Sequence, residues 1–515
     1  MKNNNTKWCR ASHVSQNFQF MGHISKVFSD IWFKVALTRG ITKFFIHFNE
    51  GNASIYFLKN EIEKNSSQLT DKILKNSSWG LKLIERIEKN HLRYFDSTES
   101  IRKIDLLKQS DKKLLKILKD TQILGLIGHE VTGSISWQLD KDNKRFNNEI
   151  GEIIEKQINK QGKNFNVKVI LPELTSPLKD TYVYKEQIDL LNIAKKIVKN
   201  NEIKDIFIET GNEQKIIEDL IRIDEKIYNQ ILKHFKNYRW LSYLYREPAY
   251  KFNYYISRLR DLAKDEISIS RLLSRYKDGK TKTLDVRKII LKELDFNKKD
   301  LAILEFARGL SYIRELRKSV LSHGTFCLRK IYVELSKRHN VTLEQIRMMD
   351  FNEITQAINE NKFDIDNLNK RIKQALFYYE RGQEKEILTG DEAGKFMQGI
   401  VIDKDEVEES EDIEGTIASS GKVQGLARIV NNIEDVKKIK TGEILVVKTA
   451  DFNLSQAINK VAGIISECGG LTCHAAIAAR EINVPCLVGA EDASKLLKDG
   501  DEIELDAQKG VIKKL

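Results

Sequence analysis

The sequence is poor in proline and cysteine, and it has no long apolar run. Of its 515 residues, 4 are proline and 5 are cysteine. Proline breaks or kinks a helix, so its scarcity is compatible with long helices. No unbroken apolar stretch approaches the roughly 18 residues that a transmembrane helix requires. We therefore expect no membrane association.

The cysteines do not follow the spacing of a disulfide framework. They stand at positions 9, 327, 468, 473 and 486. The first residues, MKNNN, also lack the apolar stretch of a secretory signal. Both observations favour a reducing compartment, and the sequence predicts a cytoplasmic protein.

Three of these cysteines lie near His474, which raises the question of a metal site. The spacing C-x4-C-H-x11-C matches none of the zinc patterns that are built on C-x2-C pairs. Cys468 and Cys486 stand in apolar, strand-like sequence, where cysteine behaves as a small hydrophobe. We predict no metal site.

The net charge of +12 is unevenly distributed. Residues 401–515 carry 14 Lys and Arg against 21 Asp and Glu, a balance of −7, which leaves +19 for residues 1–400. An acidic C-terminal region beside a basic body favours docking between them, and the basic body would attract anionic substrates. The alternative is that most of these charges belong to solvated, lysine-rich helix faces.

Several segments of the first 402 residues carry apolar residues at helical spacing. They are residues 73–87, 114–123, 188–198, 216–235, 283–338 and 368–379. Two short apolar runs around a Gly/Asn turn instead predict a β-hairpin within residues 43–58. The chain is long enough for two or three domains. We expect a large, mostly α-helical N-terminal body with this small hairpin near its start.

The most informative stretch is residues 469–481, GGLTCHAAIAARE, which follows the apolar run 461–465. This order predicts a strand, a tight turn and a helix whose first turn holds His474. The glycine pair allows a sharp turn and the close approach of a ligand. The first N–H groups of a helix have no intrahelical partner and can bind an anion. A histidine at that place can act as a nucleophile that carries a phosphoryl group.

Residues 415–515 resemble the mobile, swivelling phosphohistidine domain of the phosphoenolpyruvate-utilizing enzymes. This family includes phosphoenolpyruvate synthase, pyruvate phosphate dikinase and rifampicin phosphotransferase. The segment 469–481 and the following VPCLVG at 484–489 match the family pattern GGxTSHAA, ARE and PxxVG. The flanking family segments appear in order as GTIA at 415–418, GKVQG at 421–425, GEILVV at 442–447 and DGDEIELD at 499–506.

The resemblance assigns roles to individual residues. It implies that His474 is the phosphorylated catalytic residue and that Gly469, Gly470, Thr472, Cys473 and Arg480 stabilise the phosphate. Two features depart from the family pattern. Cys473 replaces the usual serine, and a thiol is a weaker hydrogen-bond donor than a hydroxyl. The proline-bearing turn after the "ILV" strand is also missing, since residues 448–452 read KTADF.

The resemblance also sets the expected architecture, an α+β multidomain protein with a C-terminal β/β/α swivelling phosphohistidine domain at 415–515. Before it we expect a helical region at 1–200, which contains the hairpin, and a helical acceptor-binding region at 201–402. Residues 403–414 are acidic and poor in core residues, so we interpret them as a linker that is extended by self-repulsion. An ordinary exposed loop or edge strand is the alternative.

Family members that use ATP carry an ATP-grasp domain, and dikinases and synthases carry a pyruvate-binding barrel after the swivel domain. We find neither pattern here, nor a Gly-rich Walker loop. The order of a helical region and then a swivel domain resembles the later part of rifampicin phosphotransferase. We therefore expect no identifiable cofactor on this chain, with ATP and Mg²⁺ bound by a separate ATP-grasp partner.

Two clusters in the body are candidates for the acceptor site, because a transferring phosphoryl group needs cations around it and a base for the acceptor. One runs along a predicted helix and the other mixes aromatic residues with arginine. The candidates are Arg314, Arg317, Lys318 and His323 in the first, and Trp240 and Arg246 in the second. Salt-bridged helix faces and a packed aromatic loop are the alternatives.

The sequence thus predicts a phosphotransferase component, with a kinase-type reaction. His474 would carry a phosphoryl group from ATP or phosphoenolpyruvate to a small acceptor, either pyruvate-like or bearing a hydroxyl. Nucleic acid is not an expected partner in this interpretation. The alternative is a non-enzymatic basic scaffold that binds nucleic acid or other partners and retains a vestigial swivel domain.

Overall fold

The computed structural model describes residues 7–14, 41–125, 139, 145–243, 249–381, 383, 386–402, 413–430, 433–436, 438–448, 459–467 and 474–515. The chain folds into two compact units. Unit 1 comprises residues 1–149, 243–247 and 317–406, and unit 2 comprises residues 150–242, 248–316 and 407–515. Within the described ranges, no helix has the length and the apolar character needed to cross a membrane.

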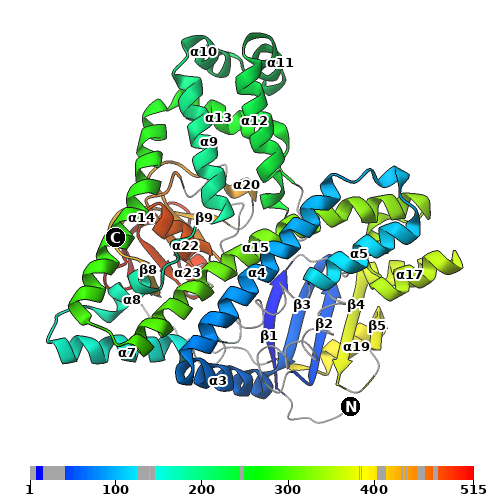
Figure 1. The fold of residues 1–515 in the computed structure, drawn as a ribbon, viewed down its shortest axis with the longest axis horizontal. Coiled ribbons are helices and arrows are strands. Elements are labelled where there is room, and N and C mark those ends of the chain that lie inside the picture. Colours follow the sequence, from blue (N-terminus) through cyan, green and yellow to red (C-terminus); the bar gives the residue numbers. More distant parts are fainter. Residues whose placement is uncertain are drawn as a thin grey trace. The chain divides into compact units, whose positions relative to one another are not determined.

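Unit 1 contains a six-stranded sheet with strand order β5-β4-β2-β3-β1-β6. Its strands are β1 (Lys7–Val14), β2 (Lys43–Asn49), β3 (Asn52–Leu58), β4 (Gln374–Glu380), β5 (Glu386–Thr389) and β6 (Val401–Ile402). The pairings are antiparallel except for β1 with β6. Figure 1 shows β1 to β5 side by side, with the helix α19 (Asp391–Gln398) at β4 and β5.

The predicted hairpin is confirmed as β2 and β3. Its two-residue turn places Glu50 at φ 46° and Gly51 at φ 84°, the left-handed pair that suits a tight hairpin. Alternate residues of β2 enter different cores, since Phe44 packs with one cluster and Phe45 with the other. Burial on both faces explains why β2 reads as an almost continuous apolar run.

The helices of unit 1 pack around this sheet. They are α3 (Lys59–Lys75), α4 (Ser77–Arg102), α5 (Asp111–Gly125), α16 (Leu343–Arg347), α17 (Phe351–Glu360), α18 (Ile365–Lys373) and the part of α15 (Lys298–Arg338) that follows residue 316. A short 3₁₀ helix, η2 (Leu106–Lys108), precedes α5. Cys327 and Ile331 of α15 join Phe44 and Phe57 in one buried cluster, so this helix covers one face of the sheet.

One helical expectation is wrong in its second half. The segment 368–379 is helical only as far as Lys373, and residues 374–380 form β4. The reason is tertiary, because β4 pairs with β2 along its whole length and its Ala375, Leu376 and Phe377 are buried. Three other segments each span two helices, with breaks at Asn76, at Asp224 and at residues 295–297.

The helical part of unit 2 is built from the part of α7 (Arg145–Gln161) that follows residue 149, α8 (Val167–Thr175), α9 (Tyr182–Val198), α10 (Asn201–Glu209), α11 (Glu213–Ile223), α12 (Glu225–Tyr238), α13 (Phe252–Lys264), α14 (Glu266–Leu294) and the first part of α15. A 3₁₀ helix, η4 (Arg239–Ser242), follows α12. We call α8 to α14 the helical group. Figure 1 shows α9, α12 and α13 running side by side within it.

Residues 413–515 of unit 2 form the C-terminal domain. Its eight-stranded sheet has the order β7-β14-β13-β9-β10-β11-β12-β8. The strands are β7 (Ile413–Glu414), β8 (Thr416–Ser419), β9 (Lys422–Val430), β10 (Ile444–Val447), β11 (Gly463–Ser466), β12 (Cys486–Val488), β13 (Glu502–Asp506) and β14 (Val511–Lys514). Short helices α20 (Ile433–Val436), α22 (His474–Glu481) and α23 (Ala493–Leu496) connect them.

The centre of this sheet is parallel from β9 to β12, and its flanks are antiparallel. The described residues of β10 and β11 are all buried, as their apolar sequences predict. The mixed α+β class expected from the sequence is confirmed, with a helical N-terminal body and a C-terminal β domain. Residues 413 and 414, at the end of the predicted linker, pair with β14, and residues 403–412 lie outside the described part.

Candidate functional site

The site expected from the sequence lies between β11 and α22. Buried β11 ends at Ser466, and α22 begins at His474, where the sequence predicts a helix start. Gly469, Gly470, Thr472 and Cys473 fall between these elements and lie outside the described residues. The described backbone therefore supplies a strand before this segment and a helix that opens with His474 after it.

Helix α22 is buried around its circumference. Residues 475–480, Ala-Ala-Ile-Ala-Ala-Arg, are all buried, because the helix packs on β8, β11 and β12 and also on α14. Four alanines in six positions let these elements approach closely without side-chain interference, and alanine is the best helix former. The composition of this short helix thus fits the tight space in which it holds His474.

Two charged residues, Arg480 and Glu481, stand at the C-terminal end of α22. Arg480 is 9% exposed. Arg287 of α14 donates hydrogen bonds to the carbonyl oxygens of Glu173 and Ser176 at 2.7 Å each. Burial, together with the positive charges of Arg308 and Arg480, lowers the pKa of Arg287 to about 10. Cations are therefore concentrated where α22 meets the helical group.

Glu481 is the acid in this environment. Thr181, which precedes α9, donates a hydrogen bond from Oγ1 to Glu481 Oε1 at 3.0 Å. Burial raises the pKa of Glu481 to about 8, and the negative charge of Glu315 adds to the rise against the opposing hydrogen bond and the charges of Lys280 and Arg480. This carboxyl group therefore holds a proton at neutral pH while the contact with the helical group persists.

Lys280 of α14 completes the charged set. Its ammonium group forms an ion pair with Asp180 and lies 3.8 Å from the centroid of the Tyr184 ring. Burial lowers the pKa of Lys280. A narrow pocket is lined by Lys280 together with Lys179, Arg480 and Glu481. An anion that enters it would meet three cations.

A second polar contact joins the C-terminal domain to the helical group. Asn459 donates to Gln187 Oε1 of α9 at 2.9 Å and accepts from Tyr276 Oη of α14 at 3.2 Å. Gln187 also accepts a hydrogen bond from Arg258 of α13 at 2.8 Å. Beside this contact lies a cavity of about 130 Å³, and its walls include Arg271 and the C-terminal residues Thr441 and Lys460.

The predicted acceptor residues divide between the two units. Arg314 and Trp240 belong to unit 2, Arg317, Lys318 and His323 belong to unit 1, and Arg246 lies outside the described residues. Arg314, Arg317 and Lys318 are half-buried along α15.

Trp240 is 1% exposed, and its Nε1 donates to the Asn237 carbonyl oxygen at 2.6 Å. The His323 side chain is fully buried. Its Nδ1 lies 2.8 Å from Thr98 Oγ1 and its Nε2 lies 2.9 Å from Glu99 Oε2. Burial lowers the pKa of His323. Within unit 1, these contacts fix the imidazole between α4 and α15.

The sequence did not single out Glu481, Thr181 or Asn459. The first belongs to the family motif, but its contact with Thr181 joins positions that are 300 residues apart. Such a pairing leaves no local sequence signal. In the described part of the chain, no group of three or more His, Cys, Asp or Glu residues is arranged to hold a metal ion.

Comparison with known proteins agrees with this geometry. Residues 439–510 match the family model of the PEP-utilising enzyme mobile domain. The chain is 29% identical to rifampicin phosphotransferase of Bacillus cereus over 262 residues, which cover 50% of this chain and 28% of that protein. It is 32% identical to rifampicin phosphotransferase of Bacillus subtilis over 169 residues, 33% of this chain and 19% of that protein.

A probable phosphoenolpyruvate synthase of Archaeoglobus fulgidus is 37% identical over 118 residues, which cover 21% of this chain and 16% of that protein. The chain thus spans less than a third of the length of these curated relatives. The shared part includes β10, β11, α22 and β12, the elements that surround His474. The C-terminal part of this chain is therefore similar to the mobile domain of the PEP-utilising enzymes.

Proposed function

We propose that this chain is a phosphotransferase component that carries a phosphoryl group on His474. The match of residues 439–510 to the mobile domain carries this proposal. It is supported by the local order of the fold, in which the buried strand β11 precedes a helix that opens with His474. A histidine at a helix start can present its imidazole to a phosphate that the helix N–H groups also contact.

The proposed reaction has two steps. First, an imidazole nitrogen of His474 attacks the phosphorus of the donor, an N–P bond forms, and the donor oxygen leaves with the electron pair of the broken O–P bond. Second, an acceptor oxygen attacks the same phosphorus, the N–P bond breaks, and its electron pair returns to the imidazole. A hydroxyl acceptor transfers its proton to a base in the second step.

We assign the phosphate-stabilising roles to residues 469, 470, 472 and 473, to the start of α22 and to Arg480. The N–H groups at the start of α22 and the Thr472 hydroxyl would donate hydrogen bonds to the phosphate oxygens. Gly469 and Gly470 would let the backbone approach the ligand. Arg480 would orient the group from the other end of α22, and Cys473 would contribute a weaker donor than serine.

The donor and the acceptor belong to other sites in this proposal. ATP or phosphoenolpyruvate would bind on a separate ATP-grasp-type chain, which would also hold Mg²⁺. A small acceptor, pyruvate-like or bearing a hydroxyl, would bind to the helical body. Arg314, Arg317 and Lys318 are half-buried, so their charges can reach a bound anion, and we retain them with His323, Trp240 and Arg246 as the proposed acceptor residues.

The experiment that tests this function measures phosphorylation of His474. The purified chain is incubated with ATP or phosphoenolpyruvate, alone and with lysate from its source, and analysed by intact mass before and after acid treatment. His474→Ala is compared with His129→Ala, a histidine that stands outside the mobile-domain match. We expect an acid-labile gain of one phosphate that His474→Ala loses and His129→Ala retains.

The conditions of the label decide between two versions of the proposal. A label with purified chain and ATP or phosphoenolpyruvate alone would show a self-sufficient enzyme. A label that requires lysate would show dependence on a partner chain. No label on His474 under any condition would contradict the carrier function, and the basic scaffold would then be the better interpretation.

A further inference from the structure

Helices α14 and α22 approach each other closely at one glycine. A Cβ atom on Gly279 of α14 would lie 2.8 Å from the carbonyl oxygen of Glu481 and 2.9 Å from that of Arg480. Real Cβ atoms do not approach backbone oxygens so closely, and a backbone atom cannot rotate away. Gly279 therefore allows the carboxyl end of α22 to rest directly on α14.

Polar side chains form further contacts near Gly279 and the end of α22. Thr181 donates to Glu481, and Lys282 of α14 donates to Asn483 Oδ1 at 3.3 Å. Lys280 is held beside them by Asp180. The helical group thus also contacts the end of α22 and the residues just after it through polar side chains.

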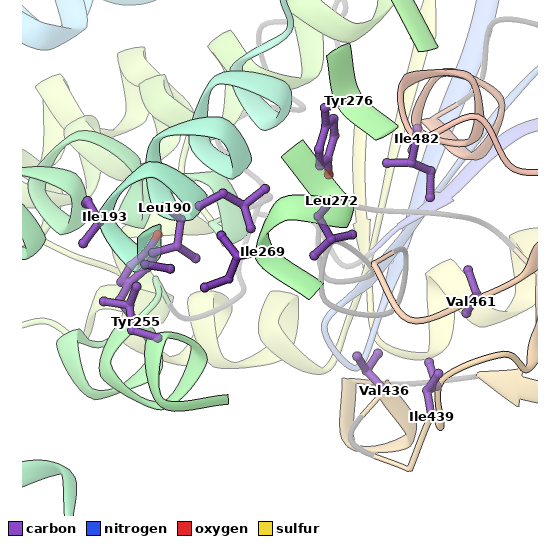
Figure 2. Packing of buried hydrophobic residues seen from close by; sticks show 14 of the residues in the cluster. Leu190, Ile193, Tyr255, Ile269, Leu272, Tyr276, Val436, Ile439, Val461 and Ile482 are labelled. Atoms are coloured by element: carbon purple, nitrogen blue, oxygen red, sulfur yellow. The ribbon is translucent and has the colours of Figure 1, made fainter. Parts of the chain in front are cut away.

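Apolar residues extend the same contact. Figure 2 shows Leu272 and Tyr276 of α14 between the α9 and α13 side chains on one side and Val461 and Ile482 of the C-terminal domain on the other. These residues belong to a single buried cluster. The structure therefore contains the C-terminal domain docked on the helical group, with a close backbone approach at Gly279.

We propose that Gly279, Thr181 and Glu481 form a latch that holds the mobile domain in this docked state and positions it there during phosphoryl transfer. The role of the latch in phosphoryl transfer rests on the proposed function, since a phosphoryl carrier must leave one site to reach another. The latch itself is a property of the fold and can be tested without phosphate.

Alanine at position 279 gives a clean test. Gly279 lies inside α14, and its φ is not in the left-handed region, so alanine would favour the helix by its propensity. Any loss of docking would then come from the added methyl group. Gly151 of α7 is the matched control, because a Cβ there would have its nearest neighbour, a Val167 methyl carbon, at an ordinary 3.9 Å.

The measurement is the rate at which a buried thiol becomes labelled. Ile482→Cys places a thiol in the interface, since Ile482 is fully buried against the helical group. Labelling by a maleimide, located by peptide mass mapping, then requires undocking. Native Cys327 in unit 1 and Cys486 in β12 are buried and report unfolding of unit 1 and of the C-terminal domain.

We expect Gly279→Ala to raise the labelling rate of the introduced thiol about tenfold, as an overpacked contact of this kind should. Gly151→Ala should leave the rate unchanged, and Cys327 and Cys486 should stay protected in both variants. Equal labelling rates in Gly279→Ala and Gly151→Ala would overturn the latch.

A second pair of variants keeps the test decisive if alanine at 279 disturbs α14. Glu481→Gln retains an acceptor for Thr181, whereas Glu481→Lys places a cation near Lys280 and Arg480. We expect faster labelling in the lysine variant only, and equal labelling in the two variants would refute the latch. Absence of His474 phosphorylation in the unsubstituted chain would instead count against the proposed function. It would leave the latch untouched, because the maleimide reaction of the introduced thiol does not depend on phosphate.

Discussion

Thr181 and Glu481 are 300 positions apart in the sequence, yet Thr181 Oγ1 donates a hydrogen bond to Glu481 Oε1 at 3.0 Å. The same hydroxyl oxygen accepts from the backbone N–H of Tyr184 at 3.0 Å and so caps α9. One side chain therefore fixes the start of a helix and contacts the helix that begins with His474.

Docking of the C-terminal domain should weaken as the pH rises. The pKa of Glu481 in the docked state is about 8, against an ordinary value of 4.5, so the docked state binds the proton more tightly. Docking is then strongest below about pH 4.5 and is progressively lost up to about pH 8. We expect the thermal unfolding midpoint of unit 2 to fall more steeply over this range in the wild type than in Glu481→Gln.

Other titratable groups also face Glu481, and the comparison with Glu481→Gln separates their effect on the pH dependence from that of Glu481. They are Glu315 of α15, Lys280 and Tyr276 of α14, Tyr184 of α9 and Arg480 of α22. Burial raises the pKa of both tyrosines and leaves them neutral in this range. Identical pH profiles for wild type and Glu481→Gln would show that Glu481 does not govern the dependence.

Removing Arg428 should destabilise the C-terminal domain. Its Nη2 and Nε donate to the two carboxylate oxygens of Glu443 at 2.6 and 3.1 Å, and the Glu443 side chain is 5% exposed. Arg428→Met leaves that carboxylate buried without its main partner, and we expect a loss of about 3 kcal/mol in the free energy of unfolding. Urea unfolding measures it.

The exposed pair Lys438–Asp435 supplies the control for this prediction. Lys438 is 65% exposed, and exposed ion pairs contribute less than about 1 kcal/mol. Lys438→Met should therefore change stability little. Adding Glu443→Gln to Arg428→Met should recover part of the loss, and purely additive effects would argue against a direct coupling.

Gly324→Ala should destabilise unit 1 although alanine favours helices. A Cβ at Gly324 of α15 would lie 2.6 Å from Cζ of the buried Tyr94 ring. We expect a loss of about 1–3 kcal/mol in the free energy of unfolding, measured by chemical denaturation. Gly394→Ala in α19, where the nearest atom is 3.8 Å away, should be neutral or stabilising. Tyr94→Leu should relieve the cost of Gly324→Ala if the ring is its cause.

Cys327 should resist thiol reagents in the folded protein. Its side chain is fully buried, and burial raises the pKa of its thiol to about 12. Since the thiolate is the reactive form, labelling should require unfolding of unit 1. Peptide mapping after maleimide treatment, with and without denaturant, measures this. Rapid labelling of Cys327 in the native chain would contradict the buried position.

Local sequence patterns were sufficient for much of the fold. The hairpin was predictable because its turn needs the left-handed residues at 50 and 51, and β11 was predictable from its apolar run. The helix breaks at Asn76 and Asp224 also have a local signal in the sequence. Each side chain caps the following helix by accepting a backbone N–H, from Trp79 and Ile227 respectively.

The remaining strands of the unit 1 sheet had no such signal. Strand β4 pairs with β2, and its first residue, Gln374, stands opposite Asn49, more than 300 positions earlier. Its apolar residues continue the helical spacing of α18, so the pattern alone could not show where the helix ends. The partner strand decides between the two structures.

For the site, the start of α22 at His474 was predictable, since the motif itself places a helix there. The contacts that hold the far end of α22 were not. They depend on a glycine in α14, a threonine before α9 and a carboxyl group whose pKa is raised chiefly by burial. The roles of the phosphate-binding and acceptor residues stay predictions.

The close approach at Gly279 has a consequence for chimaeric proteins. A C-terminal domain transplanted onto another helical scaffold would need a host helix with a glycine at the matching position, or the carbonyl oxygens of residues 480 and 481 would meet a methyl group. The glycine and the end of α22 therefore have to match each other, although separate parts of the chain encode them. An engineer who exchanges one should exchange the other with it.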